Sequence, residues 1–160
     1  MTQNVRLATE NDMPKVLELI KELASFERAP DAVEITIDQL KQDGFRQNPA
    51  FRCFIGEIDN EIHGMALVYM RYSTWKGEVL HLEDLIIDKK ARGLGLGTKL
   101  LDAVIKYGYE LKVKRVSWVV LDWNKTAIDF YIKKGAHILH GWDIVQLDEQ
   151  GIKNYISKLD

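Results

Sequence analysis

The sequence has little of several features that would point to particular classes of protein. It contains one cysteine, Cys53, so no disulfide can form within the chain, and we expect a reducing compartment. The formal net charge is −2, so no overall basic field favours a nucleic acid or a membrane surface as partner. Apolar runs are too short for a signal peptide or a membrane span. We therefore expect a cytoplasmic protein.

The chain of 160 residues also lacks internal repeats, low-complexity tracts and linkers rich in proline or serine. Its length is typical of one domain. Apolar residues make up 46% and charged residues 29%, which are ordinary values for a globular protein. We predict a single domain spanning residues 1–160.

The spacing of apolar residues predicts a mixed α/β domain. Expected helices cover residues 14–26, 37–44, 100–111 and 125–134. Expected strands cover residues 4–8, 51–58, 61–72, 78–88, 115–123, 137–139 and 142–147. The strand at 115–123 is almost entirely apolar, which is typical of a strand buried on both faces. This order of elements excludes an all-α bundle and an all-β sandwich.

Three glycines, Gly93, Gly95 and Gly97, lie between the strand at 78–88 and the helix that follows. A glycine turn before a helix is a recurrent phosphate-binding arrangement, because the first helical amides have no partner within the helix. A P-loop needs four residues between its first glycine and a Gly-Lys pair. Here only three residues separate Gly93 from Gly97, and Thr98 stands between Gly97 and the lysine, so the stretch is not a P-loop. A dinucleotide-binding turn needs G-x-G-x-x-G, whereas the spacing here is G-x-G-x-G.

The stretch Arg92-Gly93-Leu94-Gly95-Leu96-Gly97 instead resembles the coenzyme A pyrophosphate loop of the GCN5-related N-acetyltransferase (GNAT) superfamily. The blocks "DGF", "YSTWKG", "LED" and "VLDWNKTAIDFYIKKGA" are similar to its diamine N-acetyltransferase group, and "YSTWKG" and "VLDWN" to the thialysine N-epsilon-acetyltransferase branch. The resemblance implies the GNAT fold, with a mixed sheet splayed between the fourth and fifth strands and flanked by helices.

The resemblance also implies acetyl-CoA as co-substrate, with its pantetheine arm in that splay. The cofactor-binding residues that it implies are Leu85, Ile86, Ile87, Arg92, Gly93, Leu94, Gly95, Leu96, Gly97, Thr98, Asn124, Ala127 and Tyr131. The relatives are homodimers, so we expect a homodimer here.

Acetylation of an amine requires a base for the ammonium proton and an acid for the departing thiolate. By the resemblance, Tyr131 is the acid, although it also fits a packed aromatic on a helical stripe. Glu83 is the carboxylate that contacts the amine and accepts its proton, directly or through water, although it also fits the solvated face of an edge strand. A mid-strand carboxylate is costly if it is buried without a partner. Strand alternation places Asp84 on the opposite face, which makes it the weaker candidate.

The resemblance places Phe26 and Glu27 at the amine pocket, and Trp75 could wall the amine channel because an aromatic face attracts an ammonium group. Cys53 lies in an apolar strand, where inert packing is expected. His137 and His140 follow Gly135 in an expected strand, and we expect no metal site.

One departure from the diamine group bears on the substrate. The stretch "GAHILHGW" contains no acid, whereas diamine-acetylating relatives carry carboxylates there. We therefore predict a direct-attack N-acetyltransferase for a small primary amine, either a thialysine-like amino acid or a short diamine. A protein or peptide acceptor, and a non-catalytic acyl-CoA-binding module, remain alternatives.

Overall fold

The computed structural model describes residues 1–159, which form two compact units, Met1–Val119 and a second one beginning at Val120. The first unit contains a five-stranded sheet in the order β1-β2-β3-β4-β5. Its strands are β1 (Gln3–Leu7), β2 (Arg52–Ile58), β3 (Glu61–Ser73), β4 (Gly77–Ile87) and β5 (Val116–Ser117). The first three pairings are antiparallel and the last one is parallel, so the predicted mixed sheet is confirmed.

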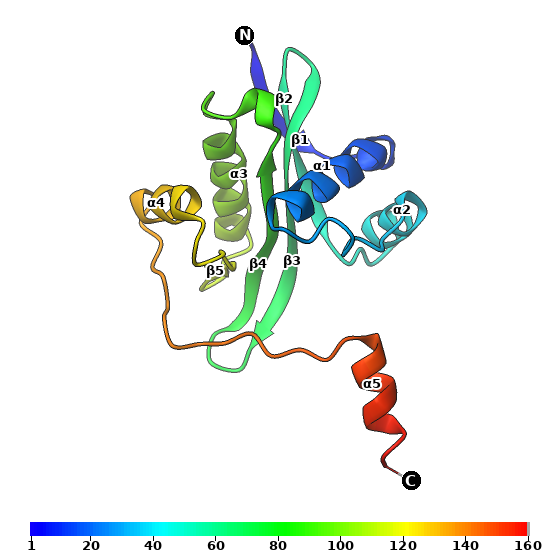
Figure 1. Ribbon diagram of the computed structural model, residues 1–160. Helices are drawn as coiled ribbons and strands as arrows, with labels where there is room; N and C mark the ends of the chain where they lie inside the picture. Colours follow the sequence, from blue (N-terminus) through cyan, green and yellow to red (C-terminus); the bar gives the residue numbers. More distant parts are fainter. Residues whose placement is uncertain (160) are drawn as a thin grey trace. The chain divides into compact units, whose positions relative to one another are not determined.

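Helices cover both faces of this sheet (Figure 1). On one face lie α1 (Met13–Phe26) and α2 (Ile37–Phe45), and on the other lies α3 (Leu96–Glu110). Two short 3-10 turns, η1 (Glu10–Asp12) and η2 (Lys89–Ala91), precede α1 and α3. We call the two sides of the sheet the α1 face and the α3 face.

Local side-chain and turn contacts determine where several of these elements begin. The Asp59-Asn60 turn joins β2 to β3 with φ of 50° and 68°, the left-handed values that a tight hairpin turn requires. Thr36 caps α2 through a hydrogen bond of 3.2 Å from the Gln39 amide. The Thr9 amide donates to Asp12 at 2.7 Å just before α1.

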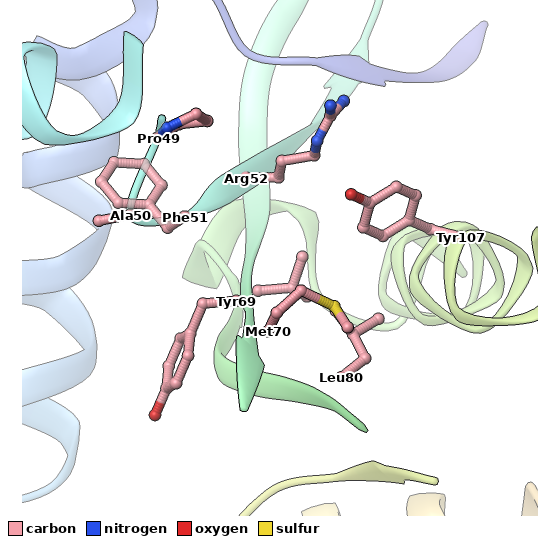
Figure 2. A pocket seen from close by; sticks show the side chains of 9 residues that line it. Pro49, Ala50, Phe51, Arg52, Tyr69, Met70, Leu80 and Tyr107 are labelled. Atoms are coloured by element: carbon pink, nitrogen blue, oxygen red, sulfur yellow. The ribbon is translucent and has the colours of Figure 1, made fainter. Parts of the chain in front are cut away.

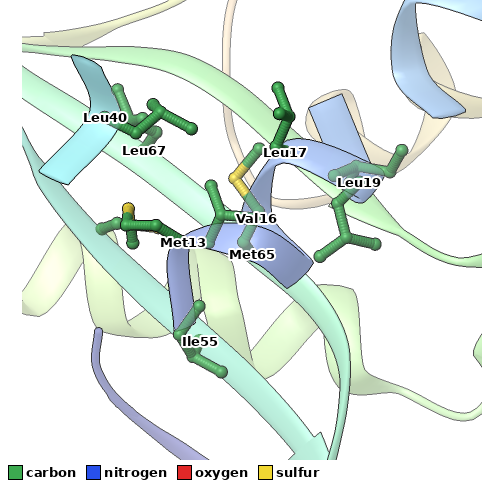
Figure 3. Close-up of a cluster of buried hydrophobic side chains, with 10 residues drawn as sticks. Met13, Val16, Leu17, Leu19, Leu40, Ile55, Met65 and Leu67 are labelled. Atoms are coloured by element: carbon green, nitrogen blue, oxygen red, sulfur yellow. The ribbon is translucent and has the colours of Figure 1, made fainter. Parts of the chain in front are cut away.

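The core on the α1 face gathers apolar side chains from five elements, α1, α2, β2, β3 and β4, and most of them are labelled in Figure 3. Met13 and Val16 of α1 pack with Ile55 of β2, and with Met65 and Leu67 of β3. Burial of this many apolar side chains is the main driving force for attaching α1 to the sheet. The core therefore fixes the end of α1 relative to β3 and β4.

A buried charge network holds β1 and β2 to the start of α1. The Arg6 guanidinium contacts Glu57 at 2.7 Å and Asp12 at 2.8 Å. The hydrogen bond from Arg6 lowers the pKa of Asp12 to about 2 against the opposing effect of burial. Asp12 is therefore ionised at neutral pH, and its ion pair with Arg6 is intact there.

Three strand predictions are wrong. Of the strand expected at 115–123, only Val116 and Ser117 pair with β4, and Val119 is 65% exposed rather than buried. Residues 137–139 and 142–147 form no strand in the described chain. A strand exists only where a neighbouring backbone accepts its hydrogen bonds, and apolar alternation alone does not supply that neighbour.

The second unit contains two helices, α4 (Lys125–Lys133) and α5 (Glu149–Ile156). Asn124 caps α4, and Gly135, with φ of 88°, follows the end of this helix. Sequence reasoning missed α5, although Asp148 accepts a hydrogen bond of 2.7 Å from the Gly151 amide as its cap. None of the helices in residues 1–159 is long and apolar enough to cross a membrane.

Candidate active site

The edge of β4 is the first element of the site. Only Leu80 and His81 pair with β5, through Val116 and Ser117. On its other edge β4 stays paired with β3 up to Ile87, where Gly64 is the partner. Within the described residues, the β5-side edge of β4 therefore lacks a strand neighbour beyond His81. Free backbone groups along such an edge can pair with an extended ligand.

The glycine stretch lies directly beyond this edge. Gly93 and Gly95 have φ of 78° and 90°, a conformation that side chains with a Cβ rarely adopt. Gly95 is the residue before α3, so the loop delivers the first amides of that helix, where partial positive charge accumulates. Gly97 has no such φ, and a Cβ there would make an ordinary contact of 3.5 Å with Ile87.

Thr98 and Arg92, both predicted cofactor residues, make hydrogen bonds within the chain. The Thr98 amide donates to the Gly95 carbonyl at 3.1 Å as part of the first turn of α3. Arg92 donates from Nε to the Ile87 carbonyl at 3.1 Å. Its guanidinium also lies 5.7 Å from the centre of the Phe26 ring and 3.6 Å from a Glu22 oxygen. Arg92 thereby connects the glycine loop to the end of α1.

A one-residue irregularity in β4 determines which way its charged side chains project. Asp84 pairs with Leu67 and Leu82 pairs with Val68, so Glu83 is an extra residue without a partner on β3. Paired residues project to the same face, and Leu67 belongs to the core on the α1 face. Asp84 therefore projects to the α1 face, together with His81, which pairs with Tyr69 two residues beyond Leu67.

This geometry corrects the expectation that Asp84 lies on the face opposite Glu83. Burial, and then the charges of Glu83 and Glu27, raise the pKa of Asp84 to about 6. The Glu83 side chain is 52% exposed, so the argument from a costly buried carboxylate applies to Asp84 instead. Sequence alternation could not reveal this, because a bulge shifts the alternation without changing residue types.

The charges of Glu83 and Glu27 therefore both act on the Asp84 carboxylate. Glu27 immediately follows α1, and partial desolvation raises its pKa. Carboxylates grouped in this way favour binding of a cation, since a positive charge relieves their mutual repulsion. Phe26, the last residue of α1, lies against the Arg92 guanidinium of the glycine loop.

The structure does not bring Trp75 to these groups. It lies in the turn between β3 and β4 and is 83% exposed. From the start of β4 at Gly77 to Glu83 the strand extends roughly 20 Å, at about 3.3 Å per residue. A role for Trp75 in the amine channel stays a prediction.

A cavity of about 230 Å³ opens beside the start of β2 (Figure 2). Arg52 and Tyr107 lie on one side of it, with the guanidinium 5.4 Å from the centre of the Tyr107 ring. Among the lining residues, Tyr69 lies close enough to Glu83 to feel its charge. Burial, and then this charge, raise the pKa of Tyr69. Glu83 and Asp84 do not line this cavity.

In the second unit, Tyr131 lies on α4 and is buried, with its ring centre 5.4 Å from that of Phe130. Burial raises its pKa, so the phenol keeps its proton at neutral pH, as a general acid must. Asn124 uses its side-chain oxygen to accept the Ala127 amide at 3.2 Å.

Two minor expectations can be compared with the structure as well. Cys53 is buried in β2, and burial raises its pKa to about 12, which keeps the thiol unreactive as predicted. Within residues 1–159, no cluster of three or more histidine, cysteine or acidic side chains is arranged to hold a metal ion.

Comparison with known proteins decides the family. The Acetyltransferase (GNAT) family matches residues 14–136. The chain belongs to this family. It is an N-acetyltransferase, and the sheet with its short β5 is the GNAT fold.

Relatives cover nearly the whole chain. Thialysine N-epsilon-acetyltransferase of Bos taurus is 33% identical, covering 96% of this chain and 97% of the relative. The Caenorhabditis elegans protein of the same name is 38% identical over 94% of each chain. L-ornithine N5-acetyltransferase of Arabidopsis thaliana is 27% identical, covering 100% of this chain and 90% of the relative.

Solved structures agree on the fold. An integron cassette protein from the mobile metagenome of V. cholerae has a TM-score of 0.79 at 18% identity, with 99% of each chain covered. An aminoglycoside acetyltransferase from an uncultured soil sample has a TM-score of 0.72 at 21% identity, covering 90% of this chain and 97% of its own.

Proposed function

We propose that this N-acetyltransferase transfers the acetyl group of acetyl-CoA to a primary amine of a small molecule, by direct attack in a ternary complex. The observation that carries the proposal is the open edge of β4. That edge covers the part of β4 from Glu83 to Ile87, before the glycine loop, so one strand serves a cationic acceptor at Glu83 and a phosphate-bearing cofactor at its end. The match at residues 14–136 spans both units, which supports one catalytic domain over 1–160.

The cofactor contacts follow from this edge. The backbone of Leu85 to Ile87 pairs with the pantetheine arm, and the loop from Arg92 to Thr98 holds the pyrophosphate near the first amides of α3. Asn124 and Ala127 contribute from the start of α4. These assignments rest on the resemblance to the family and on the positive φ of Gly93 and Gly95.

The proposed acceptor is a thialysine-like amino acid or a short diamine. Glu83 contacts the ammonium group, and Asp84 and Glu27 add negative charge beside it. Relatives named for thialysine and ornithine acetylation support a small amine that carries its own carboxylate. Residues 135–142 contain no acidic side chain. A long polycation such as spermidine is therefore attracted less strongly to this segment than a segment with carboxylates would attract it.

The first test is release of coenzyme A thiol from acetyl-CoA with thialysine, lysine, ornithine, putrescine, spermidine and a short lysine peptide. We expect kcat/KM for thialysine to exceed that for spermidine by about 5-fold, because one fewer exposed ion pair costs up to about 1 kcal/mol. The control reaction omits the amine. Turnover with the peptide alone would indicate a protein acetyltransferase, and cofactor binding without turnover of any amine would indicate an acyl-CoA-binding module.

The second test addresses Tyr131 as the acid that protonates the departing thiolate. The phenol is buried and its pKa is raised, so it holds a proton that Tyr131→Phe removes without changing the ring. We expect kcat to fall by about 100-fold, the usual contribution of one general acid, with the Kd for coenzyme A nearly unchanged. A variant with wild-type kcat would exclude Tyr131 as the acid.

We further propose a cytoplasmic homodimer. The second unit carries exposed apolar side chains at Trp142, Ile144, Val145, Leu147, Ile152 and Ile156, and surfaces of this kind usually contact another protein. The unreactive Cys53 thiol suits a reducing compartment. Light scattering should give twice the 18.4 kDa of one chain, and a mass of one chain at assay concentration would contradict the dimer.

A further inference from the structure

His81 lies where β5 leaves the sheet. It is the last residue of β4 that pairs with β5, opposite Ser117, and it pairs with Tyr69 on β3. Since paired residues project to the same face, these three side chains form a row across three strands on the α1 face. The His81 side chain is buried, with the residue only 8% exposed.

Each side of the imidazole has a specific neighbour. Nε2 lies 3.6 Å from Oε2 of Glu83, and Nδ1 lies 3.5 Å from Oγ of Ser117. The centre of the ring lies 5.1 Å from that of Tyr69. The extra residue in β4 brings Glu83 within reach of an imidazole that points to the α1 face.

The separation of 3.6 Å is too long for a hydrogen bond, so His81 and Glu83 share no proton in this state. When Ser117 accepts from the Nδ1 proton, the lone pair of Nε2 faces the carboxylate. A proton placed between these two acceptors would convert a repulsive arrangement into a charge-assisted imidazolium–carboxylate pair. The site is therefore ready to receive one proton.

A proton must leave the acceptor for the reaction to proceed. The substrate ammonium has a pKa near that of lysine, about 10.4, and only its free base attacks the thioester. A free carboxylate has a pKa of about 4.3 and a free imidazole about 6.5, so an imidazole is by nature the better matched base. The most efficient base at neutral pH has a pKa near that pH.

Burial, together with the charge of Arg71, favours the neutral form of His81 before the proton arrives. Burial lowers the pKa of the imidazole, Glu83 on β4 opposes this, and Arg71 on β3 lowers it further. Tyr69 on β3 is uncharged at neutral pH, since its pKa is raised. From β5, Ser117 contributes a hydroxyl that does not titrate.

We propose that His81 is a positioning residue that takes up the acceptor's proton through Glu83. One ammonium proton passes by way of the Glu83 carboxylate to Nε2, which leaves a neutral amine, an ionised carboxylate and an imidazolium. Attack of the neutral amine on the thioester releases coenzyme A as its thiolate. The acetylated nitrogen then loses one more proton, and the thiolate gains one, so the two changes cancel. The imidazolium returns its proton to water. This inference rests on the proposed function.

The test compares the pH profile of kcat for wild type and His81→Gln, with the amine that wild type turns over. In wild type, activity falls as the pH drops through the pKa of His81, because a protonated imidazole cannot accept a proton. In His81→Gln we expect kcat near pH 7 to fall by about 100-fold, with the KM for acetyl-CoA nearly unchanged. The deficit should shrink as the pH rises toward about 10, where free amine already predominates.

A purely structural role for His81 would give a deficit of the same size at every pH, and either that result or an unchanged kcat would overturn the proposal. The double variant His81→Gln/Glu83→Gln provides a second comparison. If both residues move one proton, the double variant loses little more than the more damaging single variant. Multiplicative losses would show independent roles. Thermal unfolding and coenzyme A titration report whether each variant folds.

A direct titration keeps the proposal testable if His81→Gln does not fold. The imidazole of His81 is titrated by NMR in wild type and in Glu83→Gln, whose altered side chain is half exposed. Because the Glu83 charge raises the pKa of His81, its removal should lower that pKa. An unchanged value would disprove the contact. If wild type turns over no amine, the proposed function fails, while this titration still judges the pair.

Discussion

The site depends on a single extra residue in one strand. Side chains in a strand alternate between faces, and one inserted residue shifts the alternation from that point onward. In β4 the insertion lies at Glu83, so Leu82 stays with the α3 face while Asp84 and Ile86 project to the α1 face. The apolar residues of β4 on both sides of the insertion, Leu82 and Ile86, therefore stay buried. The acidic residues Glu83 and Asp84 lie at the insertion itself.

The glycine loop and the end of α1 are joined by contacts that carry no catalytic chemistry. Arg92 binds the Ile87 carbonyl and reaches the Phe26 ring and Glu22 on α1, while the core of Met13, Val16 and Leu67 fixes α1 on the sheet. The glycine loop and the end of α1 are therefore held in fixed relation to each other. Such preorganisation lowers the cost of placing acceptor and cofactor together.

Local sequence signals predicted more of this structure than non-local ones. The Asp59-Asn60 turn, the Thr36 cap and the positive φ of Gly93 and Gly95 before α3 all act through neighbouring residues, so they can be recognised in the sequence. The extra residue at Glu83 and the shortness of β5 depend on pairing with other strands, so alternation misplaced Asp84 and extended β5 to 115–123. No sequence pattern pointed to His81, because its proposed role depends on contacts with Glu83 and Ser117 that form only in the folded sheet.

The central claim is that the irregular strand brings an amine and a cofactor together along β4. The most direct measurement is a crystal structure with coenzyme A and the amine that turns over. The account predicts the pantetheine arm along the open edge between Leu82 and Ile87, with the amine nitrogen within hydrogen-bond distance of Glu83 on the α1 face. An amine bound on the α3 face beside Leu80, or a cofactor bound away from that edge, would contradict it.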